Sequence, residues 1–226
     1  PPQGGVISPL LANLFLHYVF DRWMERRYPK NPFCRYADDG VIHCGTEEEA
    51  LRLREVLGTR FRECHLELHP EKTRIIYCKD DNRGKDHPHT SFDFLGFTFR
   101  PRRSKNQWGK YCINFSPAVS NEAGKGMRQE TRRWKLHRRS DKSLEELSKR
   151  VSPVVRGWIN YYGSFYRTAL YPTLTHLNRV LVKWAMRKYR RLNGHRRRAE
   201  YWLGRIARKE PWLFPHWQMG VRPTAG

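Results

Sequence analysis

The sequence lacks any long apolar segment. Its apolar runs stay well short of the roughly 18–20 residues that a membrane-spanning helix needs, so we predict no transmembrane helix and no membrane partner. It also lacks the charged start and apolar stretch of a secretory signal peptide. The chain opens on Pro1-Pro2-Gln3 without an initiator methionine, which predicts a fragment or a processed piece of a longer protein.

Cysteine is scarce and irregularly spaced. The chain has 5 cysteines and no C-x-x-C pair, which argues against a disulfide framework or a zinc site. Cys34 and Cys44 flank a predicted hairpin, but with a two-residue tip Cys34 faces position 41 or 43, not 44. We expect a reducing, intracellular setting, cytoplasmic and of bacterial type.

Acidic residues are rare in the second half of the chain. Residues 1–99 carry 14 Lys and Arg against 15 Asp and Glu, whereas residues 100–226 carry 30 against 7. Aromatic residues alternate with the basic ones there, a composition typical of a nucleic-acid partner. A well-solvated basic surface or an anionic lipid surface is the alternative, although so large an excess would repel itself without a counter-charge.

A short motif in the first half of the chain carries candidate chemistry. Apolar and aromatic residues flank Ala37-Asp38-Asp39-Gly40, and this pattern predicts a tight β-hairpin with carboxylates at its tip. The two acids could simply form the turn. However, adjacent carboxylates repel each other unless a cation lies between them, and Mg²⁺ bound by carboxylates and substrate phosphates would supply one. Such a tip suits two-metal phosphoryl transfer.

Four motifs, in this order, resemble those of group II intron reverse transcriptases. They are the stretch from Pro2 to Asn13, Tyr36-Ala37-Asp38-Asp39, Glu71-Lys72-Thr73 and Phe94-Leu95-Gly96-Phe97. Each motif alone is weak, but their order and spacing make the resemblance specific. The later helical segment, with Arg156-Gly157-Trp158-Ile159-Asn160-Tyr161-Tyr162, resembles the maturase-specific domain of the same proteins, which also serves as the polymerase thumb.

The resemblance implies an RNA-directed DNA polymerase with maturase activity, which binds intron RNA to assist splicing and mobility. It implies a two-metal Mg²⁺ site with Asp38 as the main ligand, Asp39 as the weaker one, and a third aspartate upstream of Pro1. Its partners would be group II intron RNA or another RNA template, a DNA primer or target, and deoxynucleotide triphosphates. Since the fingers and the third aspartate would lie upstream, we expect the isolated chain to bind RNA but to be inactive in DNA synthesis.

The resemblance also assigns individual residues. Contact with the incoming nucleotide and template falls to Gln3, Gly4, Tyr36 and Lys72. The grip on the primer 3′ end falls to Phe94, Leu95 and Gly96. The basic residues of the helical half are the candidates for RNA binding: Arg128, Arg132, Arg133, Lys135, Arg138, Arg139, Lys183, Arg187, Arg190 and Arg191.

Two other functions stay open. The chain could be an RNA-binding splicing cofactor without polymerase activity, with the basic half as its working part. It could also be a domesticated reverse transcriptase of phage defence or of a CRISPR adaptation system. The sequence does not identify the RNA or the oligomeric state.

The predicted fold class is α+β. A partial antiparallel palm sheet with helices on one face occupies residues 1–99, a connecting β-hairpin 100–115, a basic helical thumb 116–195 and an aromatic tail 196–226. Strands are predicted at residues 33–37, 40–44, 66–68, 74–77 and 92–100. Helices are predicted from a Ser8 cap to about Arg27, from a Thr46 cap to about Cys64, after a Ser143 cap with a kink or restart at Pro153, and from Tyr171.

Overall fold

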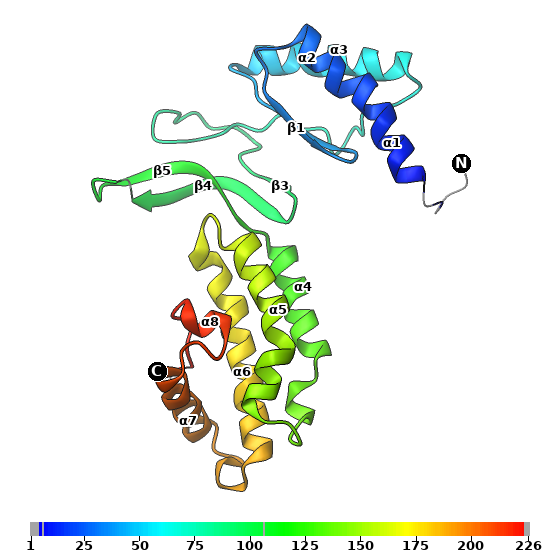
Figure 1. Cartoon of the computed structure of the whole chain (residues 1–226). Helices are drawn as coiled ribbons and strands as arrows, with labels where there is room; N and C mark the ends of the chain where they lie inside the picture. The colour runs from blue at the N-terminus through cyan, green and yellow to red at the C-terminus, as the bar shows by residue number, and fades with distance from the viewer. Residues whose placement is uncertain (1–4, 6, 106, 224–226) are drawn as a thin grey trace. The chain divides into compact units, whose positions relative to one another are not determined.

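The chain forms two compact units. The computed structural model describes residues 5, 7–105 and 107–223. The first unit holds Pro1–Tyr77 with His87–His89, and the second holds Cys78–Asp86 with Thr90–Gly226. Figure 1 shows the elements of both units. The predicted division of the chain at residues 99, 115 and 195 stays a prediction.

The first unit opens with an interrupted helix. Helix α1 (Ser8–Leu16) passes into a π-helical turn, η1 (His17–Asp21), and then into α2 (Arg22–Arg27). The prediction of one regular helix with a Ser8 cap was wrong in two respects, because the π turn inserts an extra residue and Ile7 takes the N-cap position. The extra residue changes which face is buried, so Phe20 is in the core while Phe15 is exposed.

A β-hairpin and one long helix complete the first unit. Strands β1 (Phe33–Tyr36) and β2 (Asp39–Ile42) pair antiparallel. Helix α3 (Glu47–Glu63) follows, and its predicted cap is confirmed by the bond of 3.1 Å from the Glu49 backbone N–H to the Thr46 hydroxyl. In the small core of this unit, Phe20, Met24, Leu53 and Leu57 are buried together. Phe33 and Ile42 of the hairpin pack against them.

The two strands predicted at residues 66–68 and 74–77 are absent from the described part of the chain. The alternation there is real, but a strand also needs a partner along its length. Leu66 instead donates its N–H to the Phe61 carbonyl at 2.8 Å, which closes the end of α3. The second segment makes one backbone bond to the 87–89 segment, from Tyr77 N–H to the His89 carbonyl at 2.8 Å.

The second unit begins with a three-stranded antiparallel sheet in the order β3-β4-β5. Its strands are β3 (Phe92–Phe94), β4 (Phe97–Lys105) and β5 (Tyr111–Val119). The prediction of one strand over residues 92–100 was wrong, because Leu95 and Gly96 form a tight turn between β3 and β4. Strand β5 returns from the hairpin turn at Tyr111.

Helices make up the rest of the second unit (Figure 1). The α-helices are α4 (Asn121–Arg133), α5 (Leu144–Tyr162), α6 (Tyr171–Lys188), α7 (Arg196–Lys209) and α8 (Pro215–Gln218). Short 3₁₀ turns lie between them: η2 (Leu136–Arg138), η3 (Arg167–Leu170) and η4 (Arg190–Leu192). The Ser143 cap is confirmed, and Pro153 lies inside α5 without a restart of the helix.

The core of the second unit is centred on α6. Leu174, Leu181 and Trp184 are fully buried, and α4, α5, α7 and the C-terminal segment pack around them. The aromatic tail docks on this core, with Phe214 and Trp217 fully buried.

A buried polar network fixes this tail. The Asn178 side-chain oxygen accepts hydrogen bonds from His216 Nε2 at 2.8 Å and from Trp217 Nε1 at 2.9 Å. The Asn178 amide nitrogen donates to the Val221 carbonyl at 3.1 Å. Burial lowers the pKa of His216 to about 3, so the imidazole is neutral in the folded protein at neutral pH. The histidine of this network is therefore uncharged, and the cause is its burial.

Among the helices of the described residues, none combines the length and the apolar character that crossing a membrane requires.

Candidate functional site: an acidic hairpin and a basic helical face

The hairpin loop consists of Ala37 and Asp38. Tyr36 pairs with Asp39, and Cys34 pairs with Val41. The predicted strand ends, which put Asp38 and Asp39 at the tip, were therefore wrong by one residue, since Asp39 is already the first residue of β2. Ala37 has a backbone φ of 53°, in the left-handed region that a residue with a Cβ rarely adopts. Strain of this kind is often found at functional sites.

Arg35 holds this strained turn in place. Its Nη1 donates to the Ala37 carbonyl at 2.7 Å and to the Asn13 side-chain oxygen at 3.0 Å. Its Nε and Nη2 donate to the two carboxylate oxygens of Asp21, each at 2.7 Å. These hydrogen bonds to Arg35 hold the pKa of Asp21 below its usual value. One guanidinium thus joins the turn to α1 and to the π-helical turn.

Asp38 and Asp39 present adjacent carboxylates on this turn, and both residues are exposed. Carboxylate oxygens are ligands that Mg²⁺ prefers, and Mg²⁺ often takes one or two of them together with substrate phosphates. The described residues contain no group of three or more His, Cys, Asp or Glu able to hold a metal ion. An ion at this pair would therefore need further ligands, such as the phosphate oxygens of a substrate.

The other predicted nucleotide contacts are placed only in part. Gln3 and Gly4 lie outside the described residues. Tyr36 is exposed beside Asp39 on the hairpin, and Lys72 is exposed in the turn that follows His69.

The predicted primer grip is a tight turn fixed by α5. Leu95 and Gly96 have φ values of 50° and 76°. The Tyr161 hydroxyl donates to the Leu95 carbonyl at 3.0 Å. A Cβ at position 96 would come within 2.8 Å of the Tyr162 hydroxyl, so this position has both a backbone and a space requirement for glycine.

The basic residues of α4 and α6 gather on one surface. We call it the α4–α6 basic face and define it by Arg128, Arg132, Arg179, Lys183 and Arg187. Two histidines, His137 and His176, lie close to these cations, because the charges named among the main causes of their lowered pKa values are all cationic. Arg128 also reaches from α4 to α6, where it donates to the Thr173 hydroxyl at 3.2 Å.

Both histidines are held neutral. Burial, and then the charges of Arg132, Arg128, Arg179 and Lys183, lower the pKa of His176. Burial, and then the charges of Arg187, Arg138, Lys183 and Lys135, lower the pKa of His137. Lys183 therefore lies near both rings, and this surface has an unbalanced positive potential suited to a polyanion.

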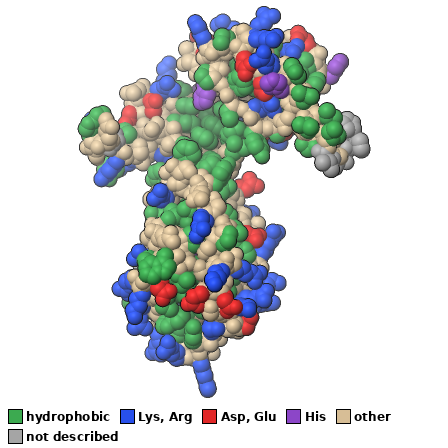
Figure 2. Space-filling model, viewed as in Figure 1, with side chains coloured by type: hydrophobic (Ala, Val, Ile, Leu, Met, Phe, Trp, Pro, Cys, Tyr) green, Lys and Arg blue, Asp and Glu red, His purple; other side chains and the backbone are tan. Residues whose placement is uncertain are grey.

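The remaining predicted RNA-binding residues are spread more widely. Lys135 and Arg138 lie near His137, next to the basic face. Arg133 forms an ion pair of 3.5 Å with Glu130. Arg139, Arg190 and Arg191 are exposed on the segments that follow α4 and α6. Figure 2 shows Lys and Arg side chains gathered over the helices of the second unit, with a few acidic side chains among them.

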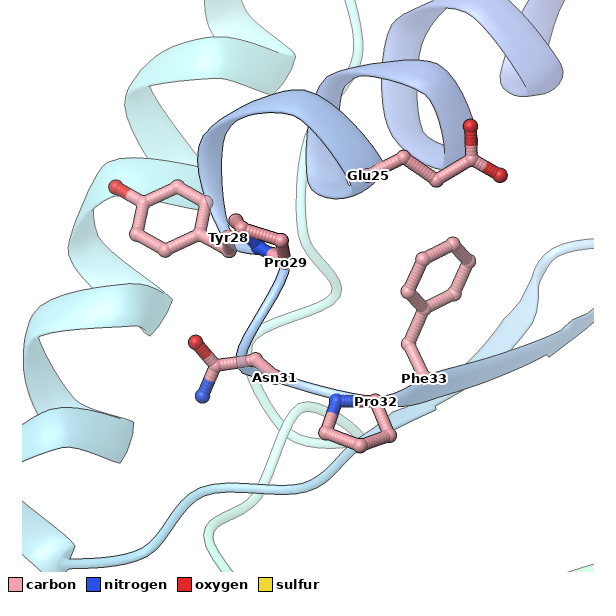
Figure 3. Close-up of a pocket in the computed structure, with 6 residues that line it drawn as sticks. All are labelled: Glu25, Tyr28, Pro29, Asn31, Pro32 and Phe33. Carbon is pink, nitrogen blue, oxygen red and sulfur yellow. The ribbon is translucent and has the colours of Figure 1, made fainter.

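The pockets of the first unit lie away from the predicted site residues. One of about 420 Å³ lies where α2 runs into β1, and Figure 3 shows the six residues that line it: Glu25, Tyr28, Pro29, Asn31, Pro32 and Phe33. The nearly buried Asn31 donates to the Glu49 carboxylate at 2.9 Å and to the His43 carbonyl at 3.1 Å. These bonds connect α2, the hairpin and α3, which gives Asn31 a structural role.

Several supporting residues escaped the sequence analysis. Arg35 was visible as the only basic residue among the strand residues flanking Asp38, and a charge in a half-buried strand is a signal for a specific partner. His176 precedes Lys183 by seven residues on α6, a spacing that puts both on one side of the helix. The contact between Tyr161 and Leu95 joins distant segments and left no sequence signal.

Comparison with known proteins found two families. Residues 1–99 match the family described as reverse transcriptase (RNA-dependent DNA polymerase). Residues 125–202 match the family described as group II intron, maturase-specific domain. The curated protein YkfC of Escherichia coli (strain K12) is 30% identical over 137 residues, which is 46% of this chain and 33% of the length of YkfC.

Proposed function

Because the chain belongs to the group II intron family of reverse transcriptases and maturases, we propose that it supplies the catalytic hairpin and the thumb of an RNA-directed DNA polymerase that also binds intron RNA. In this proposal both described units take part in one activity. The first unit presents the carboxylates, and the second holds the primer end and the RNA.

The catalytic proposal rests on one observation, the exposed pair of carboxylates on a strained turn that Arg35 fixes in place. Asp38 is the main Mg²⁺ ligand and Asp39 the weaker one. When bound, Mg²⁺ stabilises the charge that develops as a primer 3′-hydroxyl attacks the α-phosphate of a deoxynucleotide triphosphate. Arg35 bonds the Ala37 carbonyl and so keeps Asp38 from moving away from the substrate.

The remaining assignments concern binding. Gln3, Gly4, Tyr36 and Lys72 contact the nucleotide and template, and the turn of Phe94, Leu95 and Gly96 holds the primer end. Such positioning accounts for much of the rate of a phosphoryl transfer, because the chemistry itself needs little covalent help from the protein. The hydrogen bond from the Tyr161 hydroxyl of α5 to the Leu95 carbonyl supports that role.

The maturase part of the proposal rests on the α4–α6 basic face. Cationic side chains of this face lower the pKa values of two histidines, His137 and His176, after the larger effect of burial. An RNA backbone is the polyanion that the family would bring to this surface. RNA binding without DNA synthesis is therefore a second candidate function.

Primer extension by the protein as its gene encodes it tests the catalytic proposal. An RNA template, a DNA primer, deoxynucleotide triphosphates and Mg²⁺ are supplied, and the parent is compared with Asp38→Asn. We expect Asp38→Asn to lose at least about 100-fold in extension rate, the order of the effects seen when key electrostatic groups are removed. The matched control is Asp141→Asn, an exposed aspartate of the helical unit. Full activity of Asp38→Asn would rule out the catalytic assignment. A parent protein that binds RNA but does not extend the primer would favour the second candidate function.

A further inference from the structure

The outer half of the β4–β5 hairpin has an unusual composition. We call it the outer ribbon and define it by Arg103, Lys105, Trp108 and Tyr111. From residue 97 to residue 119 the chain is rich in Lys and Arg and has no Asp or Glu. No role for this ribbon follows from the hairpin or the basic face described above.

The strand register puts cations and an aromatic ring on one face. Lys105 pairs with Tyr111, and Arg103 pairs with Ile113. Cross-strand partners share a face, and residues two apart along a strand share it as well. Arg103 and Lys105 of β4 and Tyr111 of β5 therefore lie on the same face of the hairpin.

Side-chain contacts confirm that these three residues share a face. The Arg103 guanidinium carbon lies 4.1 Å from the centre of the Tyr111 ring, and the Lys105 amino nitrogen lies 5.1 Å from it. Tyr111 nevertheless remains 54% exposed, and Trp108 between the strands is 80% exposed. Tyr111 thus stays largely in solvent beside two cations, and Trp108 is also largely in solvent.

The inner half of the same face is rigidly packed. Phe99 stacks on Phe92 with ring centres 4.8 Å apart, and Phe115 lies 6.2 Å from Phe92. Because these rings belong to the same face as Arg103 and Tyr111, the outer ribbon extends from a fixed base.

We propose that the outer ribbon binds a single-stranded segment of nucleic acid, with bases stacked on Trp108 and Tyr111 and phosphates held by Arg103 and Lys105. This inference rests on the proposed function and deepens it, because it adds a second contact, away from the α4–α6 basic face, and names the form of the strand.

The chemistry favours a single strand over a duplex. Exposed aromatic rings bind bases by stacking, and a base must leave its own stack to offer a free face. Bases in a duplex are already stacked on both sides. A protein partner is less suited to this surface, because it would have to supply acidic groups for the cations while it covers the rings.

Binding by the whole chain tests this inference. Fluorescence anisotropy is measured with a labelled single-stranded RNA of mixed sequence, the single-stranded DNA of the same sequence, and an RNA duplex. The stacking variant is Trp108→Ala with Tyr111→Ala. Its control is Trp212→Ala with Tyr201→Ala, two exposed aromatic residues elsewhere in the same unit. The charge variant is Arg103→Glu with Lys105→Glu, and its control is Lys149→Glu with Arg150→Glu, an exposed pair on α5 that changes the net charge equally.

We expect the stacking variant to bind a single strand about 10- to 100-fold more weakly than the parent, and the duplex within about twofold of the parent. The aromatic control should stay within about twofold on all three probes. The charge variant should lose more affinity for single strands than the α5 charge control. Weaker binding of both RNA and DNA strands, or of RNA alone, supports the inference and identifies the strand.

Other results overturn it, and they separate it from the proposed function. If the parent binds RNA and the stacking variant binds the single strand equally well, the outer ribbon does not bind the strand and only this inference fails. Equal weakening on duplex and single strand, or equal weakening in the two charge variants, overturns it in the same way. If the parent binds no RNA, the proposed function fails as well. Circular dichroism and thermal unfolding check that each variant is folded, and the charge variant decides the matter if the stacking variant is not.

Discussion

The guanidinium of Arg35 faces the carboxylate of Asp21 with two parallel hydrogen bonds, both of 2.7 Å. The two side chains are only 13% and 17% exposed, and the same guanidinium bonds the carbonyl of Ala37 in the hairpin turn. The π-helical turn thus supports the residue next to Asp38. This link connects the stability of the first unit to the position of its proposed catalytic carboxylate.

Replacing Arg35 with alanine should therefore damage stability and activity together. We expect a loss of about 2–4 kcal/mol in the free energy of unfolding, because the largely buried Asp21 carboxylate would lose both bonds to Arg35 and keep only the longer contact with His17 Nδ1, at 3.3 Å. Primer extension should fall by at least tenfold as the Ala37 turn loosens. Urea unfolding and extension assays measure the two effects.

Arg22→Ala is the matched control for this prediction. Arg22 also bonds a carboxylate, that of Glu25 at 2.9 Å, but the two side chains are 46% and 49% exposed. An exposed pair of this kind contributes about 0.2–1 kcal/mol. Equal stability of the two variants would show that the Arg35 pair has no special role.

Gly96→Ala should destabilise the second unit more than Gly109→Ala. Both glycines have a φ of 76°, so both substitutions carry the left-handed backbone cost of roughly 1–2 kcal/mol. Only at position 96 does the new Cβ also meet the Tyr162 hydroxyl, at 2.8 Å, whereas nothing lies within 4 Å at position 109. Thermal unfolding of both variants gives the difference.

The double variant Gly96→Ala with Tyr162→Phe isolates this steric clash. Removing the hydroxyl should recover part of the stability, since other ring atoms of Tyr162 stay within 3.3–3.4 Å of the new Cβ. No recovery relative to Gly96→Ala, after correction for Tyr162→Phe alone, would mean that the backbone conformation accounts for the whole effect.

Mild acid should destabilise the protein through His216. Its pKa is about 3 in the folded chain and near 6.5 when unfolded, so the unfolded state binds more protons between these values. The contribution of neutral His216 is complete above pH 6.5 and is lost as the pH falls toward 3. From pH 7 to pH 5 the free energy of unfolding should fall by about 2 kcal/mol. The lowered pKa values of His137 and His176 act in the same direction.

Urea unfolding at pH 7 and at pH 5 measures this effect. The carboxylates with lowered pKa values, such as Asp21 and Glu49, affect stability only at lower pH, because their ordinary values are 3.8 and 4.5. In His216→Gln the amide can still donate to Asn178 but does not titrate, so the pH dependence should become shallower. An unchanged dependence in this variant would contradict the assignment.

Charge reversal on the α4–α6 basic face should weaken RNA binding and its salt dependence. In Arg132→Glu with Lys183→Glu, each phosphate that the protein no longer neutralises should reduce the slope of log affinity against log salt by about 0.7–0.9. The exposed pair Lys149→Glu with Arg150→Glu is the charge-matched control. The two variants are titrated with RNA at several salt concentrations, and equal slopes would mean that net charge alone governs binding.

The sequence was most informative where a signal is local. Asp38 and Asp39 lie on a tight hairpin as predicted, because Ala37-Asp38-Asp39-Gly40 between two apolar runs encodes a turn. Thr46 and Ser143 cap helices for the same kind of reason, since each hydroxyl bonds an amide three residues away. The α+β class was also predictable.

It was least informative where a partner lies far along the chain. Residues 66–68 and 74–77 alternate like strands, but alternation does not provide a neighbour to pair with. The Leu95 turn was hidden inside an apparent strand, and its bond to Tyr161 depends on how α5 packs. The π-helical turn at residues 17–21 also left no pattern in the sequence.

The sequence alone determined how charge is divided along the chain, with a net charge near zero before position 100 and a strongly positive one after it. It also determined the acidic hairpin and the family. Only the tertiary structure decided that Arg35 bonds Asp21 and Ala37, that α4 and α6 combine their cations, and that Tyr161 holds Leu95. The physical reason is range. Turns and caps are set by atoms a few residues apart, whereas these long-range bonds form only when burial of the cores brings distant side chains together.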